Sequence, residues 1–223
     1  MNRIPQATLE RMATLVSAED RDEMAIPSYL HKNPAMRWMA WRRVEKVAER
    51  LESFMAGRNK QSASITDFGC GTGVLLGEAS RFADRVIGID LQLEPGKMFA
   101  KEQGLKVEFM LPPDAERDIA PGSQDAVVAA EVLEHVDDVA GTLRFFSRIL
   151  KPDGRLIVSL PTENALYRLG RKLAGFEGHY HHHNAASIHG VTLAEGYTPS
   201  AITCIPAPGP LAVYWVVDYG RPR

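Results

Sequence analysis

The chain has 223 residues, of which 45% are hydrophobic and 24% charged. This mix is typical of a globular chain and excludes a disordered or fibrous one. Lysine and arginine number 26 against 28 acidic residues, which gives a net charge of −2. A chain with this charge has no general electrostatic attraction to nucleic acid, on which non-specific binding depends. The length predicts one large domain with additions at its edges. We expect a helical extension at residues 1–60 and the domain itself at 61–223.

Cysteine usage and hydropathy predict the compartment. Two cysteines, Cys70 and Cys204, are too few for a disulfide framework or a four-thiolate zinc site. The first residues lack the apolar core of a signal peptide, and every apolar run is much shorter than the roughly 20 residues of a spanning helix. We therefore expect a cytoplasmic protein with no transmembrane segment.

Helical spacing dominates the first sixty residues. Apolar side chains in residues 7–20 recur every three or four positions, which predicts a short leading helix. Asn33 and Pro34 form an N-cap signature that opens a second helix, which we expect to end at Gly57. The side of this helix away from its apolar stripe carries Arg42, Arg43, Lys46 and Arg50. We interpret these cations as a solvated face rather than an anion-binding or membrane-binding site.

From residue 64 onward, short apolar runs alternate with helical stretches. The predicted strands are 64–68, 85–90, 106–110, 126–130 and 155–160, and the predicted helices between them are 74–82, 96–103 and 139–150. Residues 201–207 and 211–218 flank a Pro-Gly-Pro sequence and are expected to form two strands joined by a tight turn. This order predicts the α/β class: a doubly wound, Rossmann-like sheet of seven strands with an antiparallel C-terminal strand.

A glycine-rich loop follows the first predicted strand and opens a helix. It contains Gly69, Gly71 and Gly73, whose missing Cβ atoms permit positive φ and let backbone N–H groups approach a ligand. A dinucleotide fingerprint would need glycine where Val74 stands, which counts against a nicotinamide dehydrogenase. The preceding Asp67 suits a cationic amino-acid group better than a phosphate.

This loop resembles the first motif of the class I S-adenosylmethionine-dependent methyltransferases, and the resemblance extends over residues 65–161. It implies an S-adenosylmethionine-binding domain whose methionine-cradling residues are Asp67, Gly69, Cys70, Gly71 and Gly73. Asp90, which ends the second strand, matches the acidic residue that binds the ribose hydroxyls, and Leu91 matches the residue that packs on the adenine. Asp114 and Ala115 match the place where a carboxylate and a backbone N–H meet the adenine ring.

Two carboxylates and an imidazole follow the fourth strand. Glu131, Glu134 and His135 would share one face of a helical turn and converge as ligands of Mg²⁺ or Zn²⁺, or as acid and base. The segment resembles that of the ubiquinone-biosynthesis and small-RNA 2′-O-methyltransferases, where it holds a divalent cation. Related small-molecule methyltransferases carry it without a metal, so a metal site, a catalytic pair of Glu131 and His135, and an inert polar turn all stay open. Glu131 is also expected in the cofactor site.

Four of the seven histidines lie in one internal segment, at positions 179, 181, 182 and 183. The segment is either a polar surface loop or, as in related methyltransferases, a cover on the substrate side of the crevice. We take His182 as its candidate catalytic residue. Residues 166–173 upstream resemble an amphipathic lid helix.

The resemblance implies an S-adenosylmethionine-dependent methyltransferase that acts on the hydroxyl of a small molecule, with or without Mg²⁺ or Zn²⁺. Trp38, Met39 and Trp41 favour a lipophilic acceptor. An RNA or protein methyltransferase is disfavoured by the net charge and by the lack of an added recognition domain. A non-catalytic S-adenosylmethionine-binding protein is the third alternative, and either a monomer or a homodimer is compatible with the sequence.

Overall fold

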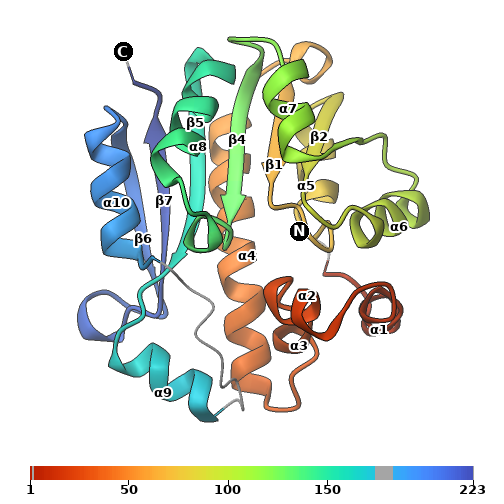
Figure 1. The fold of residues 1–223 in the computed structure, drawn as a ribbon, viewed down its shortest axis with the longest axis vertical. Coiled ribbons are helices and arrows are strands. Elements are labelled where there is room, and N and C mark those ends of the chain that lie inside the picture. Colours follow the sequence, from red (N-terminus) through yellow and green to blue (C-terminus); the bar gives the residue numbers. More distant parts are fainter. Residues whose placement is uncertain (2, 174–182, 223) are drawn as a thin grey trace.

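A single twisted sheet lies at the centre of the molecule, with helices on both of its faces (Figure 1). The computed structural model describes residues 1, 3–173 and 183–222. In these residues the strands are β1 (Ser64–Phe68), β2 (Arg85–Ile89), β3 (Glu108–Met110), β4 (Gln124–Ala130), β5 (Leu150–Pro161), β6 (Thr198–Ile205) and β7 (Tyr214–Gly220). Their spatial order is β3-β2-β1-β4-β5-β7-β6, and β7 runs in the opposite direction to the other six strands. The predicted doubly wound, seven-stranded fold is confirmed.

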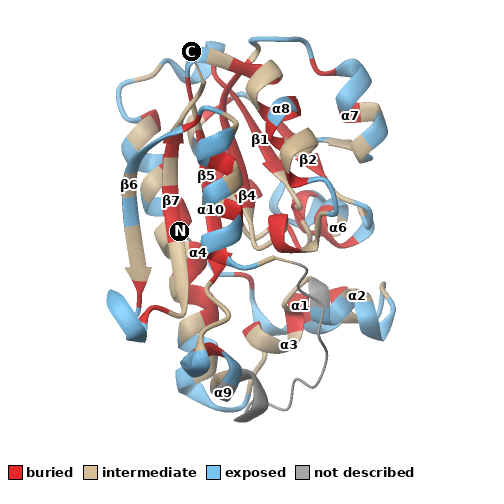
Figure 2. Cartoon of the chain, turned by 60° about the vertical axis from the view of Figure 1, so that its left-hand side comes forward, coloured by how far each residue is buried: buried red, intermediate tan, exposed pale blue. Residues whose placement is uncertain are grey.

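The sheet is buried on both faces, which explains the continuous apolar runs of its central strands. Along β4, Ala126 and Val128 pack into one core, whereas Val127 and Ala129 pack into the other, as the two-residue period of a strand requires. The first core is covered by α4 (Pro34–Met55), α5 (Leu76–Phe82) and α6 (Glu94–Gln103). The second is covered by α7 (Pro112–Asp118), α8 (Val139–Ile149) and α10 (Ala185–Ala194). Figure 2 shows the buried strands between helices whose outer faces are exposed.

The N-terminal segment forms three short helices rather than the one predicted. They are α1 (Gln6–Ala13), α2 (Ala18–Glu23) and α3 (Ile26–Tyr29), and Figure 1 shows them beside the lower half of α4. The predicted helix over residues 7–20 is wrong because Ser17 starts a new helix: its hydroxyl accepts the Asp20 N–H at 3.1 Å, and Asp20 Oδ2 accepts the Ser17 N–H at 3.3 Å. The next predicted helix is confirmed as α4, where the Asn33 side chain accepts the Ala35 N–H at 2.9 Å.

Two regions differ in detail from the sequence prediction. Residues 112–118, which are not among the predicted helices, form α7, because two prolines at the start of a helix lose no hydrogen bond and have a suitable φ. The C-terminal pair of strands is present, but β7 lies between β5 and β6, so that β6 forms the edge of the sheet. A further helix, α9 (Ala165–Leu173), follows β5. Within the part of the chain that the structure describes, no helix combines the length and apolar character needed to cross a membrane.

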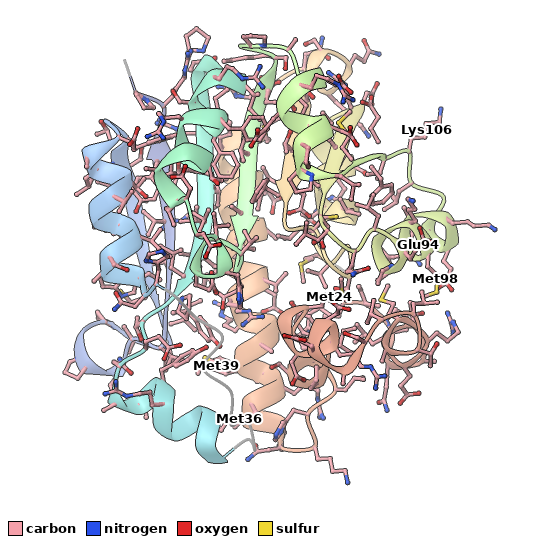
Figure 3. All side chains as sticks on the ribbon, in the orientation of Figure 1. Met24, Met36, Met39, Glu94, Met98 and Lys106 are labelled. Atoms are coloured by element: carbon pink, nitrogen blue, oxygen red, sulfur yellow. The ribbon has the colours of Figure 1, made fainter. Side chains whose placement is uncertain are left out.

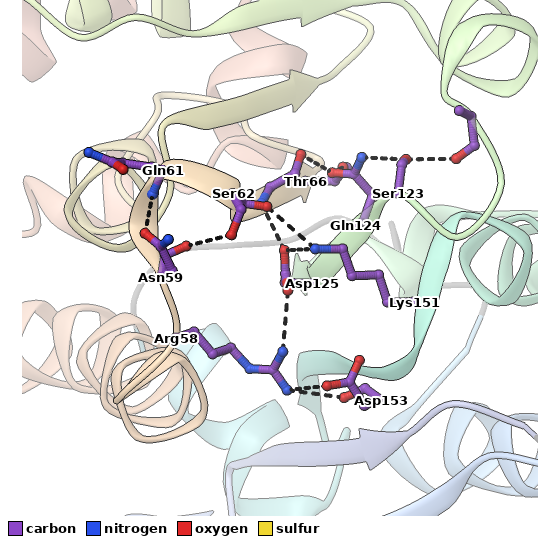
Figure 4. Close-up of polar contacts among 12 residues, drawn as sticks. Arg58, Asn59, Gln61, Ser62, Thr66, Ser123, Gln124, Asp125, Lys151 and Asp153 are labelled. Carbon is purple, nitrogen blue, oxygen red and sulfur yellow. Dashed lines mark hydrogen bonds and ion pairs between the residues drawn. The ribbon is translucent and has the colours of Figure 1, made fainter.

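A cluster of polar side chains links the strands through hydrogen bonds and ion pairs, at the end of the sheet opposite to the glycine loop (Figure 4). The buried Asp125 carboxylate accepts the backbone N–H of Ser64 at 2.9 Å, and pairs with Lys151 Nζ at 2.7 Å and Arg58 Nη1 at 3.3 Å. It thereby links the starts of β1, β4 and β5 and the segment that follows α4. The carboxyl ends of the same strands are left free to form a site.

Candidate active site

The loop between β1 and α5 needs its glycines for steric reasons. Gly69, Gly71 and Gly73 have φ values of 75°, 47° and 80°, in the left-handed region that side chains rarely adopt. A Cβ atom on Gly69 would lie 2.6 Å from the side chain of Val132. Gly69 N also donates to Ile89 O at 2.8 Å, which ties the loop to the end of β2.

Asp90 orders this loop from the next strand. Its Oδ2 accepts the Gly71 N–H at 2.7 Å, and its Oδ1 accepts the Gln92 N–H at 2.9 Å. Burial raises the pKa of the Asp90 carboxyl, and the two hydrogen bonds oppose this shift. Each carboxylate oxygen still has a free lone pair for a ligand hydroxyl.

Asp67, at the end of β1, has an unusual environment for an acidic side chain. It is 3% exposed, and no hydrogen bond or ion pair reaches its carboxyl group from the described residues. Burial, with a further contribution from Asp90, raises the pKa of Asp67 to about 7. A buried carboxyl without a partner favours a cationic ligand, since such a ligand would restore its ionised form.

These groups face one cavity of about 460 Å³ at the carboxyl ends of the strands. The predicted site residues that line it are Asp67, Gly69, Cys70, Gly71, Asp90, Leu91, Glu131 and His135. Leu91 is 76% exposed at its edge, as a platform for a flat apolar ring would be. Burial raises the pKa of the Cys70 thiol, so it lines the cavity as a neutral group. Gly73 does not line the cavity, and its positive φ contributes to the fold of the loop.

The expected adenine contacts at Asp114 and Ala115 fall outside this cavity. Asp114 pairs with Arg117 at 2.9 Å on the surface, and Ala115 is fully buried where α7 packs on the sheet. The residues of α7 that line the cavity are instead Pro112 and Glu116. The helical turn explains the change, because positions 112 and 116 share a face that 114 does not.

Glu131 directly follows β4 and has a strained backbone conformation. Its φ is 55°, a left-handed value uncommon for a residue with a side chain, and one that clusters at functional sites. Its Oε2 pairs with Arg43 Nη1 at 3.1 Å, and its Oε1 accepts the Ser159 hydroxyl at 2.9 Å. The expectation that Glu131 shares a helical turn with His135 is wrong, because only Leu133–His135 forms a short 3-10 helix after it.

Glu134 does not line the cavity. It is fully buried, and neither of its carboxyl oxygens has a hydrogen-bond partner among the described residues. Burial, reinforced by the neighbouring charge of Glu131, raises the pKa of Glu134 well above its ordinary value. These two effects favour the protonated form of Glu134.

The structure describes only some of the histidines on which the catalytic and metal-binding hypotheses depend. His135 lines the cavity beside Glu131. His182 lies outside the described residues, and of its segment the structure describes His183. Over residues 1, 3–173 and 183–222, no group of three His, Cys, Asp or Glu side chains is arranged to hold a metal ion. Among the described residues, Glu131, Glu134 and His135 are thus not arranged as the metal site that was one of the open alternatives.

The comparisons with known proteins identify the family. A family model described as a methyltransferase domain matches residues 40–199 of the chain. The chain belongs to this methyltransferase domain family. A ubiquinone biosynthesis O-methyltransferase of Xanthomonas euvesicatoria pv. vesicatoria (strain 85-10) is 36% identical over 123 residues, which cover 52% of this chain and 48% of that protein. One of Pectobacterium carotovorum subsp. carotovorum (strain PC1) is 29% identical over 141 residues, 59% of each chain.

The fold of the methyltransferase domain recurs in solved structures. The PH0226 protein from Pyrococcus horikoshii OT3 has a TM-score of 0.67 at 17% identity, covering 87% of this chain and 95% of that one. A geranyl diphosphate methyltransferase in complex with GPP and sinefungin has a TM-score of 0.62 at 18% identity, covering 79% and 78%. The predicted superfamily, the class I S-adenosylmethionine-dependent methyltransferases, is confirmed. The chain spans about half the length of the first curated relatives it matches.

Sequence reasoning missed Arg43 as a site residue of the methyltransferase domain. The expected solvated basic face is wrong for this residue, which is 6% exposed and lines the cavity. Arg42 and Lys46 do meet the expectation, since they pair with Glu45 and Glu49 on the surface. A signal was available, because Arg43 falls at helical spacing within the buried stripe of α4, whose apolar members include Ala40, Val47 and Leu51.

The N-terminal helices also contribute to the methyltransferase cavity. Asp20, Met24 and Tyr29 line it from α2, its C-terminal end and α3. A Cβ atom at Gly71 would lie 3.6 Å from Met24 Cγ, so this side chain covers the glycine loop; Figure 3 shows it above α2.

The aromatic residues of α4 do not support a lipophilic acceptor. Trp38 and Trp41 do not line the cavity, and neither does Met39. Trp41 is buried against Tyr29 with ring centroids 4.6 Å apart, whereas Trp38 is 46% exposed at the surface. The chemical class of the acceptor must therefore be argued from other side chains.

Proposed function

We propose that this methyltransferase domain transfers a methyl group from S-adenosylmethionine to a hydroxyl group of a small molecule. One observation carries the proposal: a single cavity combines an uncompensated acid at Asp67 with an ordered glycine loop and with the pair Glu131 and His135. The first group suits the cationic donor, and the pair suits an acceptor that must lose a proton. The names of the curated relatives support an oxygen acceptor.

The donor is assigned to the cavity by complementary charge and shape. Asp67 binds the ammonium of the methionine part, and the backbone N–H groups of the glycine loop bind its polar atoms. Asp90 accepts hydrogen bonds from the ribose hydroxyls, and Leu91 packs on the adenine. In place of Asp114 and Ala115, we assign the adenine edge to Pro112 and Glu116, because these are the α7 residues that reach the cavity.

Acceptor activation is assigned to Glu131 and His135. S-adenosylmethionine supplies an electrophilic methyl group on a charged sulfur. The Glu131 carboxylate, with one bond already made by each oxygen, accepts a hydrogen bond from the acceptor hydroxyl and orients it. His135, which lines the same cavity, takes the proton, since histidine is the side chain that most often acts as a general base. No step is assigned to a metal ion, because the described residues do not gather a set of ligands for one.

The N-terminal extension, residues 1–60, is assigned as a cap on the domain at 61–223. Its residues Asp20, Met24, Tyr29 and Arg43 form one wall of the cavity. A wall that excludes water strengthens the electrostatic interactions inside a site and protects a reactive donor. Residues 1–60 are therefore part of the methyltransferase and not an accessory tail.

Methyl transfer from labelled S-adenosylmethionine to a panel of phenols and catechols, with and without apolar tails, tests the proposal. We expect labelled product in the wild type, its loss in the double variant Glu131→Ala/His135→Ala, and retained donor affinity in that variant. Labelled RNA or protein instead of a labelled small molecule would contradict the acceptor class. Donor binding without any transfer would identify a non-catalytic binding protein.

A further inference from the structure

Arg43 connects three elements that are distant in the sequence. From α4, its Nη1 donates to Glu131 Oε2 at 3.1 Å and to the Tyr214 hydroxyl at 3.3 Å, so that α4, β4 and β7 meet at one guanidinium. The side chains of Arg43 and Glu131 are only 7% and 13% exposed. Unlike a surface ion pair, a buried pair leaves an uncompensated charge when one partner is removed.

The surroundings of Arg43 keep it charged and fixed. Burial is the largest single effect and alone would lower the pKa of its guanidinium. Glu131, Tyr214 and Tyr29 together outweigh it, so that the pKa lies above its ordinary value. Its Cζ lies 5.2 Å from the ring centroid of Tyr214 and 6.0 Å from that of Tyr29, within the range of cation–π attraction. Packing between two rings restricts the rotamers of the arginine side chain.

The other titratable groups near this pair do not replace Glu131 as the counter-ion. Burial raises the pKa of Tyr214 to about 12, so its side chain is a neutral phenol. Burial and the charge of Glu131 favour the protonated form of Glu134, and Glu163, in the loop after β5, acts in the same direction. Among the described residues, the Glu131 carboxylate is the one anion in an ion pair with Arg43.

Glu131 itself depends on outside support. Its φ of 55° is a conformation that persists only where neighbouring contacts hold it. Ser159 holds one oxygen and Arg43 the other, and the carboxylate they hold lines the cavity. The remaining lone pairs are those available to a ligand.

We propose that Arg43 is a positioning residue for methyl transfer, which reaches across from α4 and holds the Glu131 carboxylate in the orientation that meets the acceptor hydroxyl. The inference rests on the proposed function, since Glu131 matters in this way only if an acceptor binds there. It assigns Arg43 no contact with the donor. Its removal should therefore slow transfer without weakening donor binding.

The variants Arg43→Gln and Arg43→Lys test this role, with Arg42→Gln as the matched control on the same helix. Arg42 pairs with Glu45 and Glu49 at the surface, at 3.5 Å and 3.1 Å. For Arg43→Gln we expect kcat to fall by about 10²-fold, the effect of misplacing a catalytic group by about 1 Å, with an unchanged dissociation constant for S-adenosylmethionine. Arg43→Lys should recover part of the loss, and Arg42→Gln should match the wild type.

A pH–rate profile separates positioning from simple loss of structure. Because a carboxylate buried without its cation takes up a proton more readily, the acid limb of the Arg43→Gln profile should move to higher pH. Should that variant fail to fold, Tyr214→Phe keeps the ion pair and removes the 3.3 Å contact, and a lower kcat with unchanged donor affinity is expected.

Three results would overturn the inference. The first is a donor affinity that falls in proportion to kcat. The second is an equal loss of kcat in Arg43→Gln and Arg43→Lys with an unchanged pH–rate profile, and the third is a wild-type kcat in both Arg43→Gln and Tyr214→Phe. Failure of the proposed function is distinguishable from all three, because the wild type itself would then transfer no methyl group to any hydroxyl acceptor.

Discussion

Asp67 and Asp90 end adjacent parallel strands and face the same cavity, and neither is paired with a cation among the described residues. The charge of Asp90 adds to burial in raising the pKa of Asp67 to about 7. Two carboxyl groups close together in a dry site repel each other when both are ionised. The ligand-free protein therefore carries an electrostatic cost that a cationic ligand relieves.

Donor affinity should increase with pH. Because Asp67 must lose its proton to bind an ammonium group, raising the pH from 6 to 8 should tighten S-adenosylmethionine binding by about ten-fold, for a pKa near 7. Isothermal titration at both pH values measures this change. Asp67→Asn should bind more weakly and show no such pH dependence.

Asp84→Asn is the control for this titration, since Asp84 is exposed and pairs with Lys60 at 3.8 Å outside the cavity. It should reproduce the wild-type affinities. Equal pH dependence in Asp67→Asn and in the wild type would show that another group controls the donor affinity.

The ligand-free protein should lose stability as the pH rises. Asp67 and Glu134 both have folded pKa values raised above their ordinary values, so between about pH 4 and pH 7 the folded state binds more protons than the unfolded state. The free energy of unfolding should decrease across this window, by at most about 1.4 kcal/mol per pH unit for each group. Urea unfolding at pH 5 and pH 7 tests the sign.

Glu134→Gln separates the two contributions, because it removes one titrating group that does not line the cavity. We expect a smaller pH dependence of the unfolding free energy with normal donor affinity. A steeper dependence, or a loss of donor binding, would contradict the assignment of Glu134 as a buried acid with a raised pKa outside the cavity.

Features with a local physical cause could be predicted from the sequence. The loop at Gly69 and Gly71 demands positive φ, and its place between a strand and a helix is set by neighbouring residues. The same holds for Asp90 at the end of β2 and for α4 with its Asn33 cap. Each of these depends on contacts within a short stretch of chain or within one βα unit.

Features that depend on distant contacts could not be predicted in this way. Arg43 is a site residue only because α4 packs where β4 and β7 end. The strained φ of Glu131 breaks the helical spacing that was to unite it with Glu134 and His135. In α7, the face that reaches the cavity is set by packing on the core rather than by the residues themselves.

Gly69→Ala should destabilise the protein. The new Cβ would lie 2.6 Å from Val132, and the φ of 75° is unfavourable for alanine, so we expect a loss of about 1–3 kcal/mol in the free energy of unfolding. Chemical denaturation measures it.

Gly77→Ala is the matched control for Gly69→Ala. It lies in α5 with nothing within 4 Å of the added atom, and should stabilise the helix by about 0.5–1 kcal/mol. Equal effects of the two substitutions would contradict a steric requirement at Gly69.

Asp125→Asn should weaken the fold without affecting the cavity. It leaves Lys151 and Arg58 without their buried counter-ion, and we expect a loss of about 3 kcal/mol, the lower end of the range for buried pairs because both cations are partly exposed. Asp153→Asn removes only an exposed partner of Arg58 and should have a small effect. Donor affinity that changes in Asp125→Asn would contradict the separation of this cluster from the site.

The most direct test of the central claim is calorimetric titration of S-adenosylmethionine and, separately, of NADH into the wild-type protein at pH 8, with Asp90→Asn in parallel. We predict that one S-adenosylmethionine binds per chain and that NADH does not bind. Asp90→Asn should bind S-adenosylmethionine more weakly, because it loses one carboxylate oxygen that accepts from the ribose hydroxyls. Absence of S-adenosylmethionine binding, or binding that Asp90→Asn leaves unchanged, would contradict the assignment of this cavity to the methyl donor.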